Sequence, residues 1–240
     1  MSIPQEFQIN HPLTTFIIPS TKKPVRFRPF LCKEEKILLS AKNTPEEIIN
    51  VIKQIITNCA IDNDIKSNSL ALYDLEYLYI KLVSISISNI KHARYRDHED
   101  NKIYDFDIDL ANVDIIHNPE HSNKIKLSDN AGILLKPPVG NIPKEIWSID
   151  PKDTKSQVTA LFSLFKSCIN QVYKNEKMLD FSEQSEEDKD QFVDKLPITA
   201  FEQFRTFIRT LPKLYYKIEY KNSKEHSRTI VLETLEDFFI

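Results

Sequence analysis

Glycine is scarce in this chain, which has only Gly132 and Gly140 among its 240 residues. Phosphate-binding loops and dinucleotide-binding turns need glycine where the backbone approaches a ligand closely or takes a positive φ. The two glycines lie too far apart to form either motif, so the composition argues against P-loop and Rossmann nucleotide chemistry. Asparagine is abundant and can take some of the left-handed turn positions that glycine normally occupies.

Cysteine is scarce as well, because Cys32, Cys59 and Cys168 are an odd and widely spaced set without the CxxC or Cys/His spacing of a zinc site. We expect reduced thiols, with Cys59 and Cys168 in the core on apolar helix faces. Cys32 lies beside Lys33 and Lys36 near a helix start, a setting that favours a thiolate. A catalytic cysteine also needs an oriented base, and no histidine is brought to Cys32 by the sequence. We therefore favour a buried structural thiol, with a cysteine-dependent hydrolase or thiol enzyme using Cys32 as the alternative.

Long apolar runs, a targeting signal and an excess of positive charge are also missing. No stretch approaches the roughly 18 consecutive apolar residues of a transmembrane helix, and Met1–Glu6 lack the basic and apolar regions of a signal peptide. The formal net charge is -3, whereas domains that bind phosphate backbones concentrate Lys and Arg. We expect a soluble cytoplasmic protein that binds neither nucleic acid nor membrane.

Catalytic signatures are missing too. The sequence has no G-x-S-x-G elbow, no H-E-x-x-H motif and no paired-carboxylate pattern. We therefore predict a protein that is not an enzyme, with no catalytic residues, no cofactor and no small-molecule substrate.

Two polar clusters could in principle hold a metal. Asp105, Asp107 and Asp109 have the spacing of the first ligands of a calcium loop, but Leu110 stands where an EF-hand needs glycine and Ile116 where it needs glutamate. An alternating strand with an acidic outer face explains the three aspartates better. The neighbouring histidines are interpreted as solvated surface groups, so no metal is predicted. These histidines are His92, His98, His117 and His121.

The rest of the chain can be organised around an extended arm that turns into a helix. Val25 and Phe27 alternate with polar residues, as in a strand. Pro29 cannot donate a backbone hydrogen bond and biases Arg28 toward extended geometry, and from Glu34 onward the apolar period is that of a helix. The pattern predicts a strand-to-helix joint.

Helical periods predict further helices over residues 45–59, 70–83 and 153–173, and a hairpin near the C-terminus from 214–220 and 228–232. We expect the arm and this hairpin to lie on the same side of the fold, because neither has enough strands to be stable alone. The core face expected for the first of these helices consists of Ile48, Ile52, Ile55 and Cys59.

Short alternating runs in the middle of the chain predict a small antiparallel sheet. The predicted fold class is α+β, mainly helical, with an N-terminal extended arm, a small inserted antiparallel β subdomain and a C-terminal β-hairpin. The predicted domains are 1–95 (arm plus helices), 96–150 (inserted β subdomain) and 151–240 (helices plus terminal hairpin), with 151–240 packing against 1–95 as one domain.

Residues 211–240 are unusually rich in aromatic side chains. Core packing accounts for most of them, but exposed aromatic residues are also favoured anchors at interfaces. Strand alternation directs Tyr215 away from the face of Tyr216, and one core does not easily take both Phe238 and Phe239. We therefore predict that partners dock on this segment through Tyr215, Phe238 and Phe239.

Three separated stretches have an order and spacing in common with a known family. They are Arg28-Pro29-Phe30-Leu31 with Glu34-Glu35-Lys36 and Leu38-Leu39, then Asp74-Leu75-Glu76-Tyr77-Leu78-Tyr79, and finally Leu211-Pro212-Lys213-Leu214 through Ile218-Glu219-Tyr220 to Asp237-Phe238-Phe239. In these stretches the chain resembles the baseplate hub assembly family of T-even-type contractile-tailed phages. One departure is Thr234, which stands where we would expect glycine.

The resemblance implies a non-enzymatic viral structural or assembly protein that helps to build the central hub of a phage tail baseplate. The implied partners are other baseplate hub proteins. The implied locations are the host cytoplasm during assembly and, for a resident subunit, the tail baseplate of the virion. The resemblance supplies no catalytic residues.

Overall fold

The computed structural model describes residues 9–41, 44–62, 65–140, 142–147, 149–150 and 152–239. Met1–Glu6, where no targeting signal was expected, and Ile240, the end of the predicted docking segment, lie outside these ranges. The described chain is 40% helical and 27% strand, with 11 strands in four sheets and 8 helices. The fold is therefore α+β, but the prediction of a mainly helical chain with one small β subdomain is wrong.

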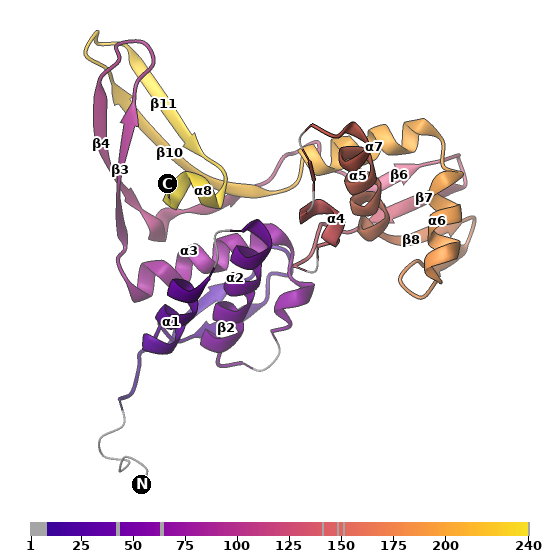
Figure 1. Cartoon of the computed structure of the whole chain (residues 1–240), viewed down its shortest axis with the longest axis horizontal. Coiled ribbons are helices and arrows are strands. Elements are labelled where there is room, and N and C mark those ends of the chain that lie inside the picture. Colours follow the sequence, from indigo (N-terminus) through magenta and orange to yellow (C-terminus); the bar gives the residue numbers. More distant parts are fainter. Residues whose placement is uncertain are drawn as a thin grey trace. The chain divides into compact units, whose positions relative to one another are not determined.

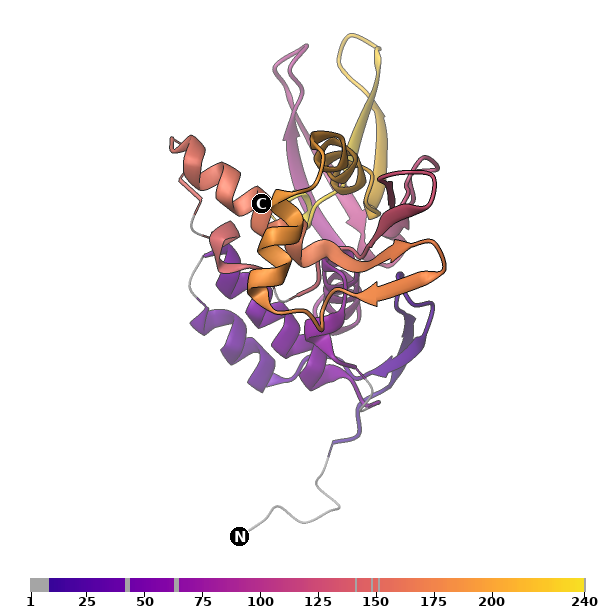
Figure 2. The ribbon, with the colours of Figure 1, turned by 90° about the vertical axis from the view of Figure 1, so that its right-hand side faces the viewer.

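The chain divides into two compact units, which are described separately (Figures 1 and 2). The first unit comprises Met1–Ile115 and Lys213–Ile240, and the second comprises Ile116–Pro212. The helices and strands that begin in the first unit are β1 (Thr14–Ile17), β2 (Pro24–Phe27), α1 (Cys32–Ser40), α2 (Pro45–Cys59), α3 (Leu72–Ser86), β3 (Ile90–Arg96), β4 (Ile103–Asp109), β5 (Asp114–Ile116), β10 (Lys213–Lys221), β11 (Ser227–Leu232) and α8 (Leu235–Phe239).

The predicted strand-to-helix joint is present, with β2 ending at Phe27 and α1 beginning at Cys32. Between them, the Arg28 guanidinium donates to both carboxylate oxygens of Glu34 at 3.0 Å and to the Asn58 carbonyl at 2.7 Å. Glu34 is fully buried and also accepts the Leu31 N–H at 2.9 Å. Burial alone would raise the pKa of Glu34, but the hydrogen bonds from Arg28 and Leu31 and the Arg28 charge hold it below its usual value. The pair joins the end of β2 to α1 and to the last turn of α2.

A second buried carboxylate fixes the start of α3. Asp74 accepts the Ala71 N–H at 3.1 Å, which satisfies a free donor at the helix N-terminus. It also accepts the Ser20 N–H at 2.8 Å and the Ser20 hydroxyl at 2.5 Å. Ser20 lies in the β1–β2 turn, so Asp74 ties this hairpin to α3, and an apolar core containing Phe27, Ile55 and Leu75 fills the space between them.

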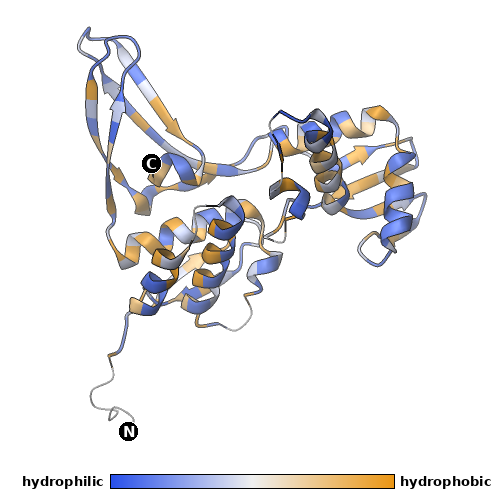
Figure 3. Ribbon diagram, in the orientation of Figure 1, coloured by the Kyte–Doolittle hydropathy of each residue, from blue (hydrophilic) through white to orange (hydrophobic). Residues whose placement is uncertain are grey.

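The middle of the chain does not form one inserted sheet. β3 and β4 pair as their own antiparallel hairpin, while β5 joins β10 and β11 in a three-stranded sheet of order β11-β10-β5. Figure 3 shows apolar and polar residues alternating along these strands. Local alternation in the sequence predicts strands but does not indicate their partners, and the partner of β5 is β10, about 100 residues further along the chain.

The tips of the two hairpins are joined by a polar network. Asp97, fully buried beyond the end of β3, accepts the Tyr220 hydroxyl at 2.6 Å and the Arg228 Nε–H at 3.1 Å. Glu99 accepts an Asn222 amide N–H at 2.8 Å.

Four residues other than glycine take a positive φ in the described chain. Two of them, Asn101 and Asn175, are asparagines in hairpin turns, as the composition suggested.

The N-terminal arm and the C-terminal hairpin, which we expected on the same side of the fold because neither is stable alone, do not pair with each other. β1 and β2 form a separate two-stranded sheet, and the end of β2 bridges to Ala60 instead. The additional strand that β10 needs comes from β5.

The second unit is a four-stranded antiparallel sheet of order β6-β7-β8-β9 with helices packed on it. The helix predicted over 153–173 ends at Cys168, and the next six residues form β8, in which Val172 pairs with Ile133. The Asn175 turn at φ 54° then returns the chain as β9. The elements are β6 (Lys124–Lys126), β7 (Ala131–Leu135), α4 (Lys144–Trp147), α5 (Thr154–Cys168), β8 (Ile169–Lys174), β9 (Lys177–Asp180), α6 (Glu186–Asp194) and α7 (Ile198–Arg209).

One of the two glycines is required by packing in this sheet. A Cβ at Gly132 of β7 would overlap the Tyr173 ring of β8 and the Ile125 carbonyl of β6. The core below the sheet stacks Phe165 of α5 on Phe204 of α7, with ring centroids 4.6 Å apart. This unit therefore has an apolar core of its own.

Candidate interaction surface

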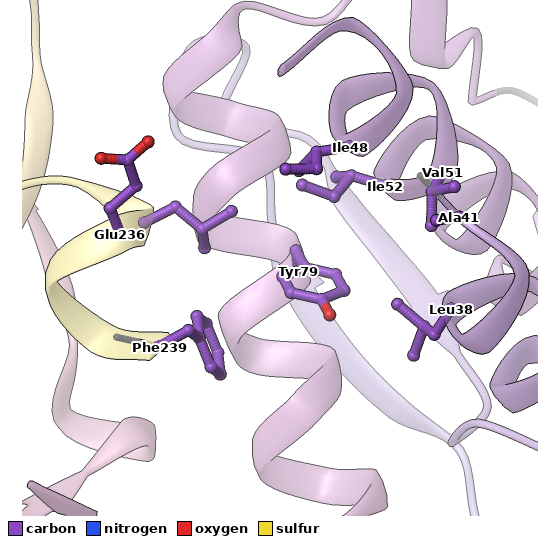
Figure 4. A pocket seen from close by; sticks show the side chains of 9 residues that line it. Leu38, Ala41, Ile48, Val51, Ile52, Tyr79, Glu236 and Phe239 are labelled. Atoms are coloured by element: carbon purple, nitrogen blue, oxygen red, sulfur yellow. The ribbon is translucent and has the colours of Figure 1, made fainter. Parts of the chain in front are cut away.

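An open apolar groove of about 290 Å³ lies on the first unit between α1, α2, α3 and α8 (Figure 4). Tyr79 of α3 lies between Phe239 of α8 and Leu38 of α1 in this view. The volume is at the lower limit of small-ligand pockets, so it suits a few side chains of a partner. The lining residues are Leu38, Ala41, Ile48, Val51, Ile52, Tyr79, Leu235, Glu236 and Phe239.

α2 forms one wall of the groove, because the core covers only part of the apolar face of this helix. Thr44 caps this helix and Pro45 takes its first position, as the sequence predicts. Ile52 is buried, but Ile48, predicted to be a core residue, is 41% exposed at the groove. The helical period indicates which face is apolar but not where the covering elements end.

The α8 wall is held by Asp237, which accepts the backbone N–H groups of Glu233 at 2.9 Å and Thr234 at 2.8 Å. Burial alone would raise the pKa of Asp237, but these hydrogen bonds hold it below its usual value. The helix thereby directs Phe238 into the core, where it is 1% exposed, and leaves Phe239 36% exposed. The Phe239 ring contacts Tyr79 edge-on, with centroids 5.9 Å apart.

The three predicted docking residues do not come together. Phe239 lines the groove, whereas Phe238 belongs to a core cluster with Ile80 and Leu232. Tyr215 is half-buried on β10 and is not among the groove-lining residues. The local sequence indicated aromatic density, but the contribution of α1 and α2 to the groove depends on long-range packing.

Acidic side chains lie on the α8 and α3 sides of the groove. Glu236 lines it, and Glu76 precedes Tyr79 by three positions, so Glu76 and Tyr79 share a face of α3. Burial, and secondly the negative charge of Glu236, raise the pKa of Glu76 to about 7. Burial, and secondly the charge of Glu35, raise the pKa of Tyr79. Sequence analysis missed Glu76, although an acidic residue on an otherwise apolar helix face is a visible signal.

The cysteines have different environments. Cys32 is exposed, so the interpretation as a buried thiol is wrong, because α1 directs its first residue to solvent. No hydrogen bond or ion pair joins Cys32 to a histidine within the described ranges. Cys59 and Cys168 are core residues, as predicted, and burial raises their thiol pKa values to about 11 and about 12.

The candidate metal ligands are dispersed. Asp105 pairs with Arg94 at 3.0 Å and Asp107 with His92 at 2.5 Å across the β3–β4 hairpin, while Asp109 caps a short turn. Among the described residues, no three His, Cys, Asp or Glu side chains are placed to hold a metal ion.

The fold is an α+β fold of two compact units, and its candidate site is an apolar groove lined by four helices. The chain belongs to the T4 bacteriophage base plate protein family, whose model matches residues 11–240. No curated protein and no solved structure is similar enough to this chain to count as a match. The protein is thus a structural protein of a phage baseplate. None of the helices in the described residues is long and apolar enough to span a membrane.

Proposed function

We propose that this chain is a non-enzymatic component of the central hub of the baseplate, either as a resident subunit or as an assembly factor that leaves. The observation that carries the proposal is the exposed Phe239 beside an apolar groove, in a family whose members build baseplates. Its partners would be other hub proteins, met in the host cytoplasm during assembly.

The C-terminal segment is the proposed docking region. Phe239 supplies an exposed aromatic anchor, the buried Phe238 holds α8 in place, and Tyr215 offers a second, half-buried ring on β10. An aromatic anchor at an interface typically contributes about 2 kcal/mol or more to binding. Loss of Phe239 should therefore weaken assembly without unfolding the protein.

The test compares Phe239→Asp with Val231→Asp, which alters an apolar residue of β11 that is 43% exposed and does not line the groove. In infected-cell extracts we expect Phe239→Asp to impair hub assembly and Val231→Asp to leave it unchanged, while both proteins melt like the wild type. Unimpaired assembly with Phe239→Asp would contradict the docking role, and mass spectrometry of purified virions separates a resident subunit from a transient factor.

Exposure of Cys32 is the observation that keeps a thiol enzyme as the second candidate. Cys32→Ser should leave hub assembly unchanged if the chain acts by contact alone. If the chain is a thiol enzyme, Cys32→Ser should instead abolish its thiol-dependent activity.

A further inference from the structure

One carboxylate lines the groove, and a second lies next to a groove residue on α3. Glu236 lines the groove from α8, and Glu76 lies half-buried on the Tyr79 face of α3. Within the described part of the chain, no ion pair involves either residue. Glu236 lines the groove directly and Glu76 is one helical turn from the lining residue Tyr79, so a positive charge in this part of the groove would be stabilised by negative charge on both sides.

Two lysines of the first unit, Lys91 beside the groove residue Phe239 and Lys81 on α3, have contacts other than the two glutamates. Lys91 places its Nζ 5.8 Å from the centre of the Phe239 ring. Lys81 donates to the Ala111 carbonyl at 2.5 Å and lies over the Tyr77 ring. Among the residues that the structure describes, neither lysine forms an ion pair with Glu76 or Glu236, so the two carboxylates can still pair with a basic side chain of a partner.

The shape of the groove favours a helix. Its walls and floor are themselves helices, and side chains of an added helix can fill the furrow between packed helices. Helix-in-groove recognition places apolar anchors about one turn apart along one face of the incoming helix. In such a helix, a Lys or Arg beside the apolar face would lie opposite the two glutamates.

We propose that this groove binds a basic amphipathic helix of another baseplate protein, with apolar side chains between Phe239 and Ile48 and a Lys or Arg facing Glu76 and Glu236. The inference rests on the proposed contact role of the C-terminal segment and specifies the chemistry of the partner. The exposed apolar arm of a second copy, which carries Ile9, Leu13 and Ile17, fits less well, because residues 9–17 contain no Lys or Arg to meet the glutamates.

The experiment uses the full-length protein and two synthetic helical peptides with the same leucine stripe, one flanked by lysines and the other by glutamates. Fluorescence anisotropy should show the lysine peptide binding about tenfold more tightly than the glutamate peptide, with affinity falling as salt is raised. The double variant Glu76→Gln, Glu236→Gln should reduce this preference severalfold, and Glu236→Lys should favour the glutamate peptide.

A matched pair of substitutions on α1 tests whether the peptide binds in the groove. Leu38→Asp, in the groove, should abolish peptide binding, whereas Leu39→Asp, next to it but 78% exposed and outside the groove, should not. Circular dichroism confirms that both variants fold, and if Leu38→Asp does not, Phe239→Asp takes its place.

Four results would overturn the proposal: no binding of the lysine peptide, equal binding of both peptides, no effect of the glutamate changes, or equal loss in Leu38→Asp and Leu39→Asp. Self-association of the chain that Phe239→Asp abolishes would assign the groove to a second copy instead. These outcomes are independent of virion composition and hub assembly, so the hub proposal can stand if the basic helix fails.

Discussion

At the scale of single residues, neighbours in the sequence have opposite roles. Phe238 and Phe239 are adjacent, yet one is a core residue and the other lines the groove. The helix geometry of α8 separates them, because successive side chains on a helix point about 100° apart. Composition therefore indicates how many aromatic residues the segment holds, and the helix decides which of them a partner can reach.

Glu76 gives a prediction about stability and pH. Its pKa is about 7 in the folded protein against an ordinary value of 4.5, so the folded state holds this proton more tightly than the unfolded state. The stability from protonated Glu76 is therefore present below pH 4.5 and is lost as the pH rises through 7. We expect Glu76→Gln to raise the free energy of unfolding at pH 8 by roughly 1–3 kcal/mol relative to the wild type.

Urea denaturation of both proteins at pH 5, 6, 7 and 8 measures this effect. Glu183→Gln, which changes an exposed glutamate on the second unit, is the charge control and should show no such gain. If the gain of Glu76→Gln were the same at pH 5 and pH 8, the ionisation of Glu76 would not be its cause.

At the scale of elements, the joint between β2 and α1 depends on one buried ion pair. Arg28→Met should destabilise the first unit by about 3–5 kcal/mol, because it leaves the Glu34 carboxylate buried without its cation. Adding Glu34→Gln to Arg28→Met should recover part of this loss, since the remaining group is then neutral. The free energies of unfolding of the two single variants and the double variant complete the cycle.

Arg26→Met is the matched control for this joint. Arg26 pairs with Asp62 at 2.6 Å, but its side chain is 57% exposed, so the loss of this pair should be much smaller. Equal losses for Arg26→Met and Arg28→Met would mean that burial of the Arg28–Glu34 pair does not determine its contribution.

At the scale of the whole molecule, the two units have separate apolar cores. The core of the second unit is built from its own sheet and helices, including Phe165, Phe204 and Ile133. We therefore expect a fragment of residues 116–212 to fold alone and to unfold cooperatively on heating, because a chain of about 100 residues can bury a sufficient core.

Near-ultraviolet circular dichroism and calorimetry of this fragment provide the measurement. Phe204→Asp in the same fragment should abolish the transition, because it buries a charge in the core. A fragment with strand and helix signals but no cooperative transition would show that the second unit needs the rest of the chain.

The sequence by itself determined the local features of this protein. The scarcity of glycine, the capped start of α2, the joint at Pro29 and the alternation in β10 depend on near neighbours, so their signals are local. The family resemblance, which rested on the order of three such stretches, is confirmed by the match over residues 11–240.

The tertiary structure decided which elements meet. The pairing of β5 with β10, the end of α5 at Cys168 and the exposure of Ile48 all depend on partners distant in the chain, which a local period does not indicate. The groove also depends on long-range packing, since α1, α2 and α3 come from the first part of the chain and α8 from its end. Its acidic residue Glu236 lines the same groove as Tyr79 of α3, which lies far from it in the sequence.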